Sequence, residues 1–332
     1  MKINGDVNYT GTLKLQGRDV KQYLDNHYEL GMILIRGVIG GGYIGGSIYN
    51  TLTTIRYSTD AWLTSASTLS SNCGGGVKYG GWASAHTAGY VMKNQQNSGT
   101  CNDKVIFATD AVSAIGARTY GSESWSSFQH GIGYETTGVA YGTKAYTCGL
   151  QTTGYDKLTF ATDAWAAASD ANIPQNYHSV AWFDKEYGYH YAGATNRTAI
   201  YPFANETWYT LSTTNTPVGL GFPQVYLEKG LNSKKGKFYL AGSASWYNNT
   251  IFQHRNNIAT WTVNYGSQTL PNCETAGTMG QNHGYLAGGY QSNVSGGQNA
   301  HSDKVYHDTD SIVNIADAPR PLSSASPMWS PI

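Results

Sequence analysis

Apolar and polar residues alternate along this chain in short runs, and one such run returns six times. Its clearest copy is residues 156–165, DKLTFATDAW, in which an apolar stretch precedes a turn-like Thr-Asp and then a tryptophan. The acidic position of this run defines a column that comprises Asp60, Asp110, Asp163, Glu206, Ala259 and Asp310. The steps along this column are 50, 53, 43, 53 and 51 residues. Self-similarity with a period of about 50 residues predicts a chain built from repeated structural units.

A glycine/aromatic run forms a second column with nearly the same period. Its copies include residues 89–92, GYVM, and 284–289, GYLAGG. The column comprises Tyr43, Tyr90, Val139, Tyr189, Phe238 and Tyr285, with steps of 47, 49, 50, 49 and 47 residues. Two columns that keep one period six times make chance similarity a poor explanation.

Short apolar runs between glycine-rich turns predict strands, so the chain is predicted to be all-β. Its 40 glycines and 26 tyrosines suit twisted strands and tight turns. The repeated acid is predicted to lie in a tight turn, where its carboxylate binds nearby backbone amides. Each repeat is then one four-stranded sheet, and radial packing of six such sheets in a β-propeller buries both faces of each.

Two of these runs resemble elements of a known repeat. Residues 284–289 resemble the strand that ends in Gly-Gly in kelch-type β-propeller repeats, and residues 163–165 resemble the Asp-to-Trp element of that family. Kelch repeats often carry a histidine before the glycine/aromatic run, and this chain has His86, His130, His178 and His283 there. The resemblance covers roughly residues 38–332 and implies a six-bladed kelch-like β-propeller. It is specific for fold and hardly at all for function.

Both ends of the chain depart from the repeat. Residues 1–37 predict an attachment segment with a short strand at 11–15 and one helix, which Asp19 caps and Gly31 ends. The helix has an apolar stripe that packs either on the propeller or on another chain, formed by Val20, Tyr23, Leu24 and Tyr28. Residues 321–330 are predicted to add a strand to the first repeat and so close the ring without a covalent link.

Charge and composition narrow the set of partners. Charged residues make up 13% of the 332 residues and the formal net charge is zero, so neither nucleic acid nor an anionic membrane is expected as a partner. No apolar run approaches the roughly 18 residues of a membrane span, and the first residues lack the apolar stretch of a secretory signal. The four scattered cysteines are expected to be free thiols, with one disulfide between neighbouring repeats as the alternative.

The repeated acids and histidines are predicted to be structural. A catalytic or metal site needs unlike groups in one place, whereas a column spreads like groups round a ring. We therefore expect no catalytic residue, no cofactor and no metal ligand, with a histidine-bound metal at the ring axis as the open alternative. Tyrosine and tryptophan in an uncharged framework suit stacking on sugar rings. The candidate ligand-binding residues, which otherwise form core, are Trp82, Trp125, Trp182, Trp246 and Tyr247.

Residues 6–20 are similar to the opening segments of bacteriophage fibre and decoration proteins. This likeness implies a non-enzymatic virion protein that is assembled in the host cytoplasm and is oligomeric in the particle. Residues 1–37 would dock on other virion proteins, and the propeller would bind host-surface glycans or decorate the particle. The alternatives are a glycan-active hydrolase or oxidase on the same fold and an intracellular kelch-like adaptor. The repeats around Glu206 and Ala259, which depart most from the pattern, are the expected partner surface.

Overall fold

The computed structural model describes most of the chain from residue 36 onward and four residues before it. The described residues are 14–15, 18–19, 36–44, 47–70, 81–85, 87–92, 101–119, 124–129, 133–135, 138–140, 143–149, 153–173, 179–183, 187–192, 197–210, 224–227, 237–241, 250–255, 260–267, 276–279, 283–290, 298–306, 309, 311–322 and 326–330. Within them every regular element is a β-strand, which confirms the predicted all-β class. None of them belongs to a helix with the length and hydropathy of a membrane span.

The predicted helix, with Val20, Tyr23, Leu24 and Tyr28, lies outside the described residues. What the structure does describe of the first 35 residues is a two-stranded hairpin of β1 (Lys14–Leu15) and β2 (Arg18–Asp19). The attachment role of this segment therefore stays a prediction.

Six four-stranded antiparallel sheets contain most of the strands. The first sheet orders β28 (Ser326–Ser330), β3 (Arg36–Ile44), β4 (Ser47–Arg56) and β5 (Ala61–Thr68). The second orders β6 (Gly81–Ser84), β7 (Ala88–Met92), β8 (Asn102–Ile106) and β9 (Ala111–Ile115). The third orders β10 (Ser124–Gln129), β13 (Lys144–Gly149), β14 (Gly154–Thr159) and β15 (Ala164–Ser169).

The remaining three sheets follow the same order along the chain. The fourth orders β16 (Ser179–Phe183), β17 (Tyr187–Ala192), β18 (Arg197–Pro202) and β19 (Tyr209–Thr210). The fifth orders β20 (Gln224–Leu227), β21 (Lys237–Ala241), β22 (Thr250–Arg255) and β23 (Thr260–Ser267). The sixth orders β24 (Ala276–Met279), β25 (His283–Tyr290), β26 (Gln298–Tyr306) and β27 (Ile312–Ile315).

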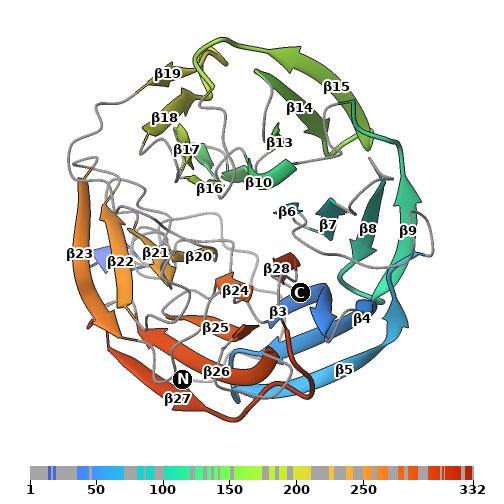
Figure 1. Ribbon diagram of the computed structural model, residues 1–332, viewed down its shortest axis with the longest axis vertical. Helices are drawn as coiled ribbons and strands as arrows, with labels where there is room; N and C mark the ends of the chain where they lie inside the picture. The colour runs from blue at the N-terminus through green and yellow to red at the C-terminus, as the bar shows by residue number, and fades with distance from the viewer. Residues whose placement is uncertain are drawn as a thin grey trace.

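The sheets follow one another around the centre of the molecule, with the first strand of each nearest the centre and the fourth at the periphery (Figure 1). Each central strand contacts the central strands of both neighbouring sheets, in the order β28, β6, β10, β16, β20, β24 and back to β28. The largest buried cluster draws side chains from several sheets, among them Val38, Trp82, Tyr146, Phe183 and Tyr285. We use "joint" for the contact between two successive sheets.

Burial along the strands explains their composition. In β8 the side chains are buried on both faces, because this third strand lies between two neighbouring sheets as well as between two strands. In β9, β15 and β27 no residue is buried and at least half of the residues are exposed, and these fourth strands carry alanine, serine and asparagine. Apolar runs therefore mark inner strands, and mixed runs mark the outermost ones.

The strand register shows that two residues of the glycine/aromatic column, Val139 and Tyr43, do not occupy the position equivalent to Tyr90. Val139 lies in a separate hairpin of β11 (Gly133–Glu135) and β12 (Gly138–Ala140), which is inserted between the first two strands of the third sheet. The second strand of that sheet is β13, where Tyr146 pairs with Lys157 as Tyr90 pairs with Lys104. In the first sheet, Tyr43 lies beyond a register shift between Gly40 and Gly42, and Val38 occupies the equivalent position.

The C-terminal segment pairs with the beginning of the first sheet. β28, which lies within residues 321–330, runs antiparallel to β3 from Ser326↔Gly40 to Ser330↔Arg36. The stretch before it is held to both neighbouring sheets. Leu322 N donates to the carbonyl of Asn299 at 3.2 Å, and Arg320 Nη2 donates to the carbonyls of Gly41 and Thr51 at 2.8 and 2.9 Å. The C-terminal strand β28 thus shares one sheet with β3, the first strand of the repeats.

The cysteines include a disulfide bond, which departs from the expectation of four free thiols. Free thiols were expected for Cys73, Cys101, Cys148 and Cys273, whereas Cys101 is disulfide-bonded. The sequence favoured thiols because the four positions are scattered and form no spacing motif. Spacing along the chain carries no information on which cysteines the sheets bring together.

Candidate functional site

The repeated acids share an unusual backbone conformation. Asp60, Asp110, Asp163 and Glu206 have φ angles of 54°, 54°, 53° and 51°, in the left-handed region. Each lies in the turn between the third and fourth strands of its sheet, which we call the acidic turn. Asp tolerates this conformation better than most residues, which explains why the turn favours it. The sequence predicted that the carboxylates bind amides of their own turn, but their partners lie in the preceding sheet.

The joint between the second and third sheets shows the arrangement most clearly. Lys104 Nζ lies 3.0 and 2.8 Å from the two carboxylate oxygens of Asp163. The hydroxyl of Tyr90 donates to Asp163 Oδ1 at 2.9 Å, and its ring stacks on Phe160 at 5.0 Å. Burial, followed by the hydrogen bond to Asp163, raises the pKa of Tyr90, so this phenol stays protonated and keeps donating. The acidic turn of one sheet is therefore held by a lysine and a tyrosine of another.

The joint between the third and fourth sheets uses two cations. Lys144 and Lys157 each bind one carboxylate oxygen of Glu206, the latter at 2.8 Å, and the Tyr146 hydroxyl lies 3.2 Å from Oε1. Burial raises the pKa of Glu206, but the hydrogen bonds from Lys144 and Lys157 outweigh it and lower this pKa to about 2. These ion pairs are partly exposed, so each contributes at most about 1 kcal/mol to stability.

The joint between the first and second sheets replaces lysine with arginine. Arg36 Nη2 lies 2.8 Å from Asp110 Oδ1 and also donates to the carbonyl of Phe107. Ser65 Oγ donates to the other carboxylate oxygen of Asp110 at 3.3 Å. The cation at this joint comes from the start of the second strand and not from the third strand, so two different positions serve the same purpose.

A second set of acidic residues, Asp103 and Asp156, lies in the third strands and contacts the preceding sheet. Asp103, immediately before Lys104, is fully buried and accepts hydrogen bonds from Ser70 N, at 2.9 Å, and from Ser70 Oγ. Asp156, immediately before Lys157, accepts one from Thr119 N at 3.1 Å. Ser70 and Thr119 follow the last strand of the preceding sheet. The pairs Asp103-Lys104 and Asp156-Lys157 therefore each bind the preceding sheet through Asp and the following sheet through Lys.

The joint between the sixth and first sheets gathers the largest set of unlike groups. Lys304 Nζ lies 2.9 and 3.0 Å from the Asp60 oxygens, and the Tyr285 hydroxyl donates to Asp60 Oδ1. His283 Nε2 lies 2.7 Å from the Tyr285 hydroxyl. Because that hydroxyl already donates to Asp60, it accepts from His283, which requires the Nε2–H tautomer. Tyr57 stacks on Tyr285 at 5.3 Å.

Burial and hydrogen bonds shift the pKa values of three groups at this joint. Burial, and then the charge of Lys304, lowers the pKa of His283 to about 4, so the imidazole is neutral at pH 7. Burial, and then the hydrogen bond to Asp60, raises the pKa of Tyr285. Burial raises the pKa of Asp60, but hydrogen bonds from Lys304 and Tyr285 outweigh it and lower the net value. At pH 7 the phenol of Tyr285 is therefore protonated, and the carboxylate of Asp60 is ionised and paired with Lys304.

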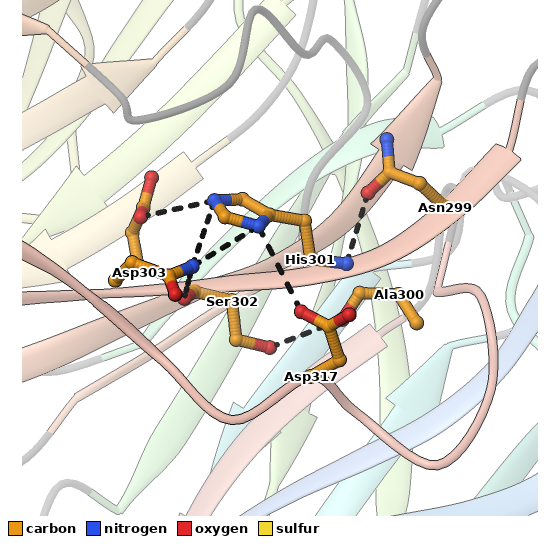
Figure 2. Close-up of polar contacts among 7 residues, drawn as sticks. Asn299, Ala300, His301, Ser302, Asp303 and Asp317 are labelled. Carbon is orange, nitrogen blue, oxygen red and sulfur yellow. Dashed lines mark hydrogen bonds and ion pairs between the residues drawn. The ribbon is translucent and has the colours of Figure 1, made fainter. Parts of the chain in front are cut away.

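A histidine of the sixth sheet lies between two acids (Figure 2). His301 Nε2 lies 3.2 Å from buried Asp303, and Nδ1 lies 3.7 Å from Asp317, whose side chain is 66% exposed. Asn314 Nδ2 lies 3.1 Å from His301 Nδ1 and donates to the carbonyl of Ser302 at 3.3 Å. All these partners belong to β26, β27 and the residues directly after β27. The group therefore stabilises the pairing of β26 with β27. Among the described residues, no group of three or more His, Cys, Asp or Glu side chains has an arrangement that could hold a metal ion.

The five candidate ligand-binding residues lie in different parts of the fold. Trp82 is 5% exposed, and its ring centroid lies 6.4 Å from that of Phe183. It therefore belongs to the core and is not available to a ligand. Trp125 lies in β10 and Trp182 in β16, both central strands. Trp246 and Tyr247 lie outside the described residues, between β21 and β22. Of the four histidines before the glycine/aromatic runs, His283 alone is described.

Comparisons with known proteins bear on the fold. No family model matches the chain, and no curated protein matches its sequence. Among solved structures it is similar to that of a protein named YjhT, with a TM-score of 0.54 and 10% identity, covering 75% of this chain and 86% of that chain. In all, 609 chains of solved structures match, so the fold is common and does not by itself select a function.

A buried histidine makes stability depend on pH. His190 is 1% exposed, both its ring nitrogens lack a hydrogen-bond partner among the described residues, and burial lowers its pKa to about 4. The unfolded chain takes up this proton near pH 6.5, so stability contributed by neutral His190 is lost as the pH falls from about 6.5 to about 4. We expect His190→Leu to lessen this loss by at most about 3 kcal/mol. Urea unfolding of both proteins at pH 7 and pH 4.5 measures it, and an equal loss in both would contradict the prediction.

Proposed function

We propose that the six four-stranded sheets are the blades of a kelch-like β-propeller that acts as a rigid, non-enzymatic scaffold. The observation that carries this proposal is the use of the recurring ionisable side chains. Asp60, Asp110, Asp163 and Glu206 each engage a cation of the preceding sheet. Groups committed to holding sheets together are not poised for chemistry. The round of contacts between central strands supports the propeller.

We place this scaffold on a bacteriophage particle. Of the predicted segment 1–37, the residues before β3 attach it to other virion proteins, in keeping with the likeness of residues 6–20 to fibre and decoration proteins. The propeller then faces outward. Assembly takes place in the host cytoplasm, and the protein is oligomeric in the particle. Zero net charge favours this exposed position, because it avoids non-specific attraction to nucleic acid and anionic membranes.

The proposed ligand is a neutral glycan of the host surface. The adjacent aromatic residues Trp246 and Tyr247 provide the stacking faces that sugar rings use, and serine, threonine and asparagine provide hydrogen-bonding groups. Trp125 and Trp182 are further candidates on central strands.

A glycan array probed with the full chain tests the binding proposal. The double variant Trp246→Ala/Tyr247→Ala is expected to lose binding at least about tenfold, since such aromatic contacts dominate interface energies. Tyr209→Ala is the matched control, because Tyr209 is 46% exposed but lies on the outer strand β19. Equal binding by the double variant, or no glycan bound by the wild type, would refute the proposal. Turnover of a bound glycan that is lost in His283→Ala would instead support the hydrolase or oxidase alternative.

The docking proposal has its own test. A full chain in which Val20, Tyr23, Leu24 and Tyr28 are all changed to serine is expected to fold but not to co-sediment with virus particles. Changing Lys21 and Asn26 of the same segment to serine provides the control and should leave co-sedimentation intact. Particle association by the first variant would remove the attachment role of residues 1–37.

A further inference from the structure

The disulfide-bonded Cys101 directly precedes β8, the third strand of the second sheet. Its partner within the chain is Cys73, Cys148 or Cys273. A disulfide forms only where the backbone brings two cysteines within about 7 Å, measured between their Cα atoms. Cys73 and Cys273 lie outside the described residues, so the register of β8 and the reach of the chain from described residues decide between the three.

Cys101 lies on the side of the second sheet that meets the first sheet. Successive residues of a strand alternate between the two faces of the sheet. Lys104 binds Asp163 of the third sheet, whereas Asp103 accepts hydrogen bonds from Ser70, two residues beyond the last strand of the first sheet. Cys101 precedes Asp103 by two residues and therefore has the same face as Asp103.

Cys73 is the cysteine that the chain delivers to this face. Ser70 N lies 2.9 Å from Asp103 Oδ2, so the backbone that leaves the first sheet passes beside β8. Cys73 follows Ser70 by three residues, which span at most about 11 Å of chain. Cys101 precedes Asp103 by two residues, or about 7 Å of extended strand. Cys73 is therefore within reach of Cys101.

The register position of Cys148 belongs to a different joint. Cys148 pairs with Tyr155 in the third sheet, and the Tyr155 ring lies 5.9 Å from that of Tyr201 and 6.1 Å from that of Trp208. Both of these rings belong to the fourth sheet or its last turn. Cross-strand partners share one face of a sheet. The position of Cys148 is thus on the face that meets the fourth sheet, away from the second.

Cys273 belongs to the other side of the first sheet. It precedes β24, the central strand of the sixth sheet, by three residues. β24 contacts β28 of the first sheet, and β28 in turn contacts β6 of the second. The first sheet therefore lies between the sixth sheet and the second (Figure 1). Three residues of chain are too short to carry Cys273 past a whole sheet to the third strand of the second.

We infer that Cys73 and Cys101 form the disulfide and that it joins the first sheet covalently to the second. The bond reinforces the joint at which Arg36 also binds Asp110. Closing the loop between the two cysteines restricts the unfolded chain and so favours the folded one. Disulfides persist in oxidising surroundings and are rare in the cytosol, where thiols are kept reduced. The joint between the first two sheets is therefore strongest outside a reducing compartment.

Peptide mapping of the full chain identifies the partner directly. Free thiols are alkylated in the denatured protein, which is then digested without reduction and examined by mass spectrometry. A cross-linked pair of peptides that contain Cys73 and Cys101 is expected. Alkylated Cys101, or a cross-link from Cys101 to Cys148 or Cys273, would overturn the inference.

Thermal unfolding with and without dithiothreitol tests what the bond does. Two electrons and two protons pass from the dithiol to the bond, which yields two cysteine thiols and a cyclic disulfide of the reagent. This reduction is expected to lower the melting temperature by about 5 °C, because the unfolded chain regains its freedom. Cys73→Ser and Cys101→Ser should each remove the response to dithiothreitol, whereas the control Cys148→Ser should keep it. A full response in Cys73→Ser, or its loss in Cys148→Ser, would contradict the assignment.

Discussion

Removal of residues 321–332 is expected to abolish the cooperative thermal unfolding transition of this protein. β28 would be lost, and with it the pairing along β3 and the central contact with β6. Two fully buried side chains, Leu322 and Met328, would go as well. Burial of two such side chains is worth at least about 5 kcal/mol, which is comparable with the whole stability of many domains, about 5–15 kcal/mol. Differential scanning calorimetry should show a broad transition without a defined melting temperature.

A point substitution keeps this test informative if the truncated chain does not fold. Met328→Ala is expected to cost about 2–5 kcal/mol, because Met328 packs against Gly89 in the neighbouring sheet. Val313→Ala is the control and should change stability by less than about 0.5 kcal/mol, because Val313 is 40% exposed on the outer strand β27. An unchanged melting temperature after truncation would mean that the C-terminal strand does not close the ring.

The second large loss of stability is expected from a substitution at Gly288, which has a φ angle of +67° in the sixth sheet. A β-carbon at this position would lie 2.6 Å from Leu322 Cβ and 2.7 Å from both the nitrogen and the oxygen of that residue. Backbone atoms cannot rotate away, so the C-terminal segment would have to shift. We expect Gly288→Ala to destabilise the protein by about 3 kcal/mol or more, from the left-handed conformation and from the clash together.

Gly116→Ala is the matched control for this substitution. A β-carbon there would meet nothing closer than Trp165 Cδ1 at 3.9 Å, which is ordinary contact. Its effect on the free energy of unfolding should stay within about 1 kcal/mol, measured by urea denaturation. Similar losses for Gly288→Ala and Gly116→Ala would show that Leu322 does not pack tightly on the sixth sheet.

Much of the fold could be predicted because its units repeat. The acidic column marks the turn between the third and fourth strands at Asp60, Asp110, Asp163 and Glu206, and the structure keeps all four in one conformation. The glycine/aromatic column failed at Val139 for a specific reason. The inserted hairpin β11–β12 has the same glycine and apolar pattern as a second strand, and it lies at the expected distance along the chain. A periodic signal cannot distinguish an insertion that mimics the repeat.

The role of the repeated acids could not be read from local sequence. Asp163 and Lys104 are 59 residues apart, and Asp60 and Lys304 are 244 apart, so the pairing depends on which sheets become neighbours. One signal was nevertheless present. Lysine recurs six residues before the acid at Lys104, Lys157 and Lys304, and the repeat that precedes the one with Ala259 has Ile200 at this position. Side-chain identities that change together within one chain point to a contact between repeats, whereas a turn motif alone would not require it.

A double-mutant cycle on Lys104 and Asp163 tests most directly whether the recurring acids hold successive sheets together. Lys104→Met, Asp163→Asn and the double variant should be compared with the wild type by urea unfolding at low salt. The ion pair predicts a coupling of about 0.5–1 kcal/mol, with the two single losses together exceeding the loss in the double variant. The coupling should shrink in 1 M salt, where exposed charges are screened. Strictly additive losses at both salt concentrations would contradict the account, because the acid would then act within its own turn alone.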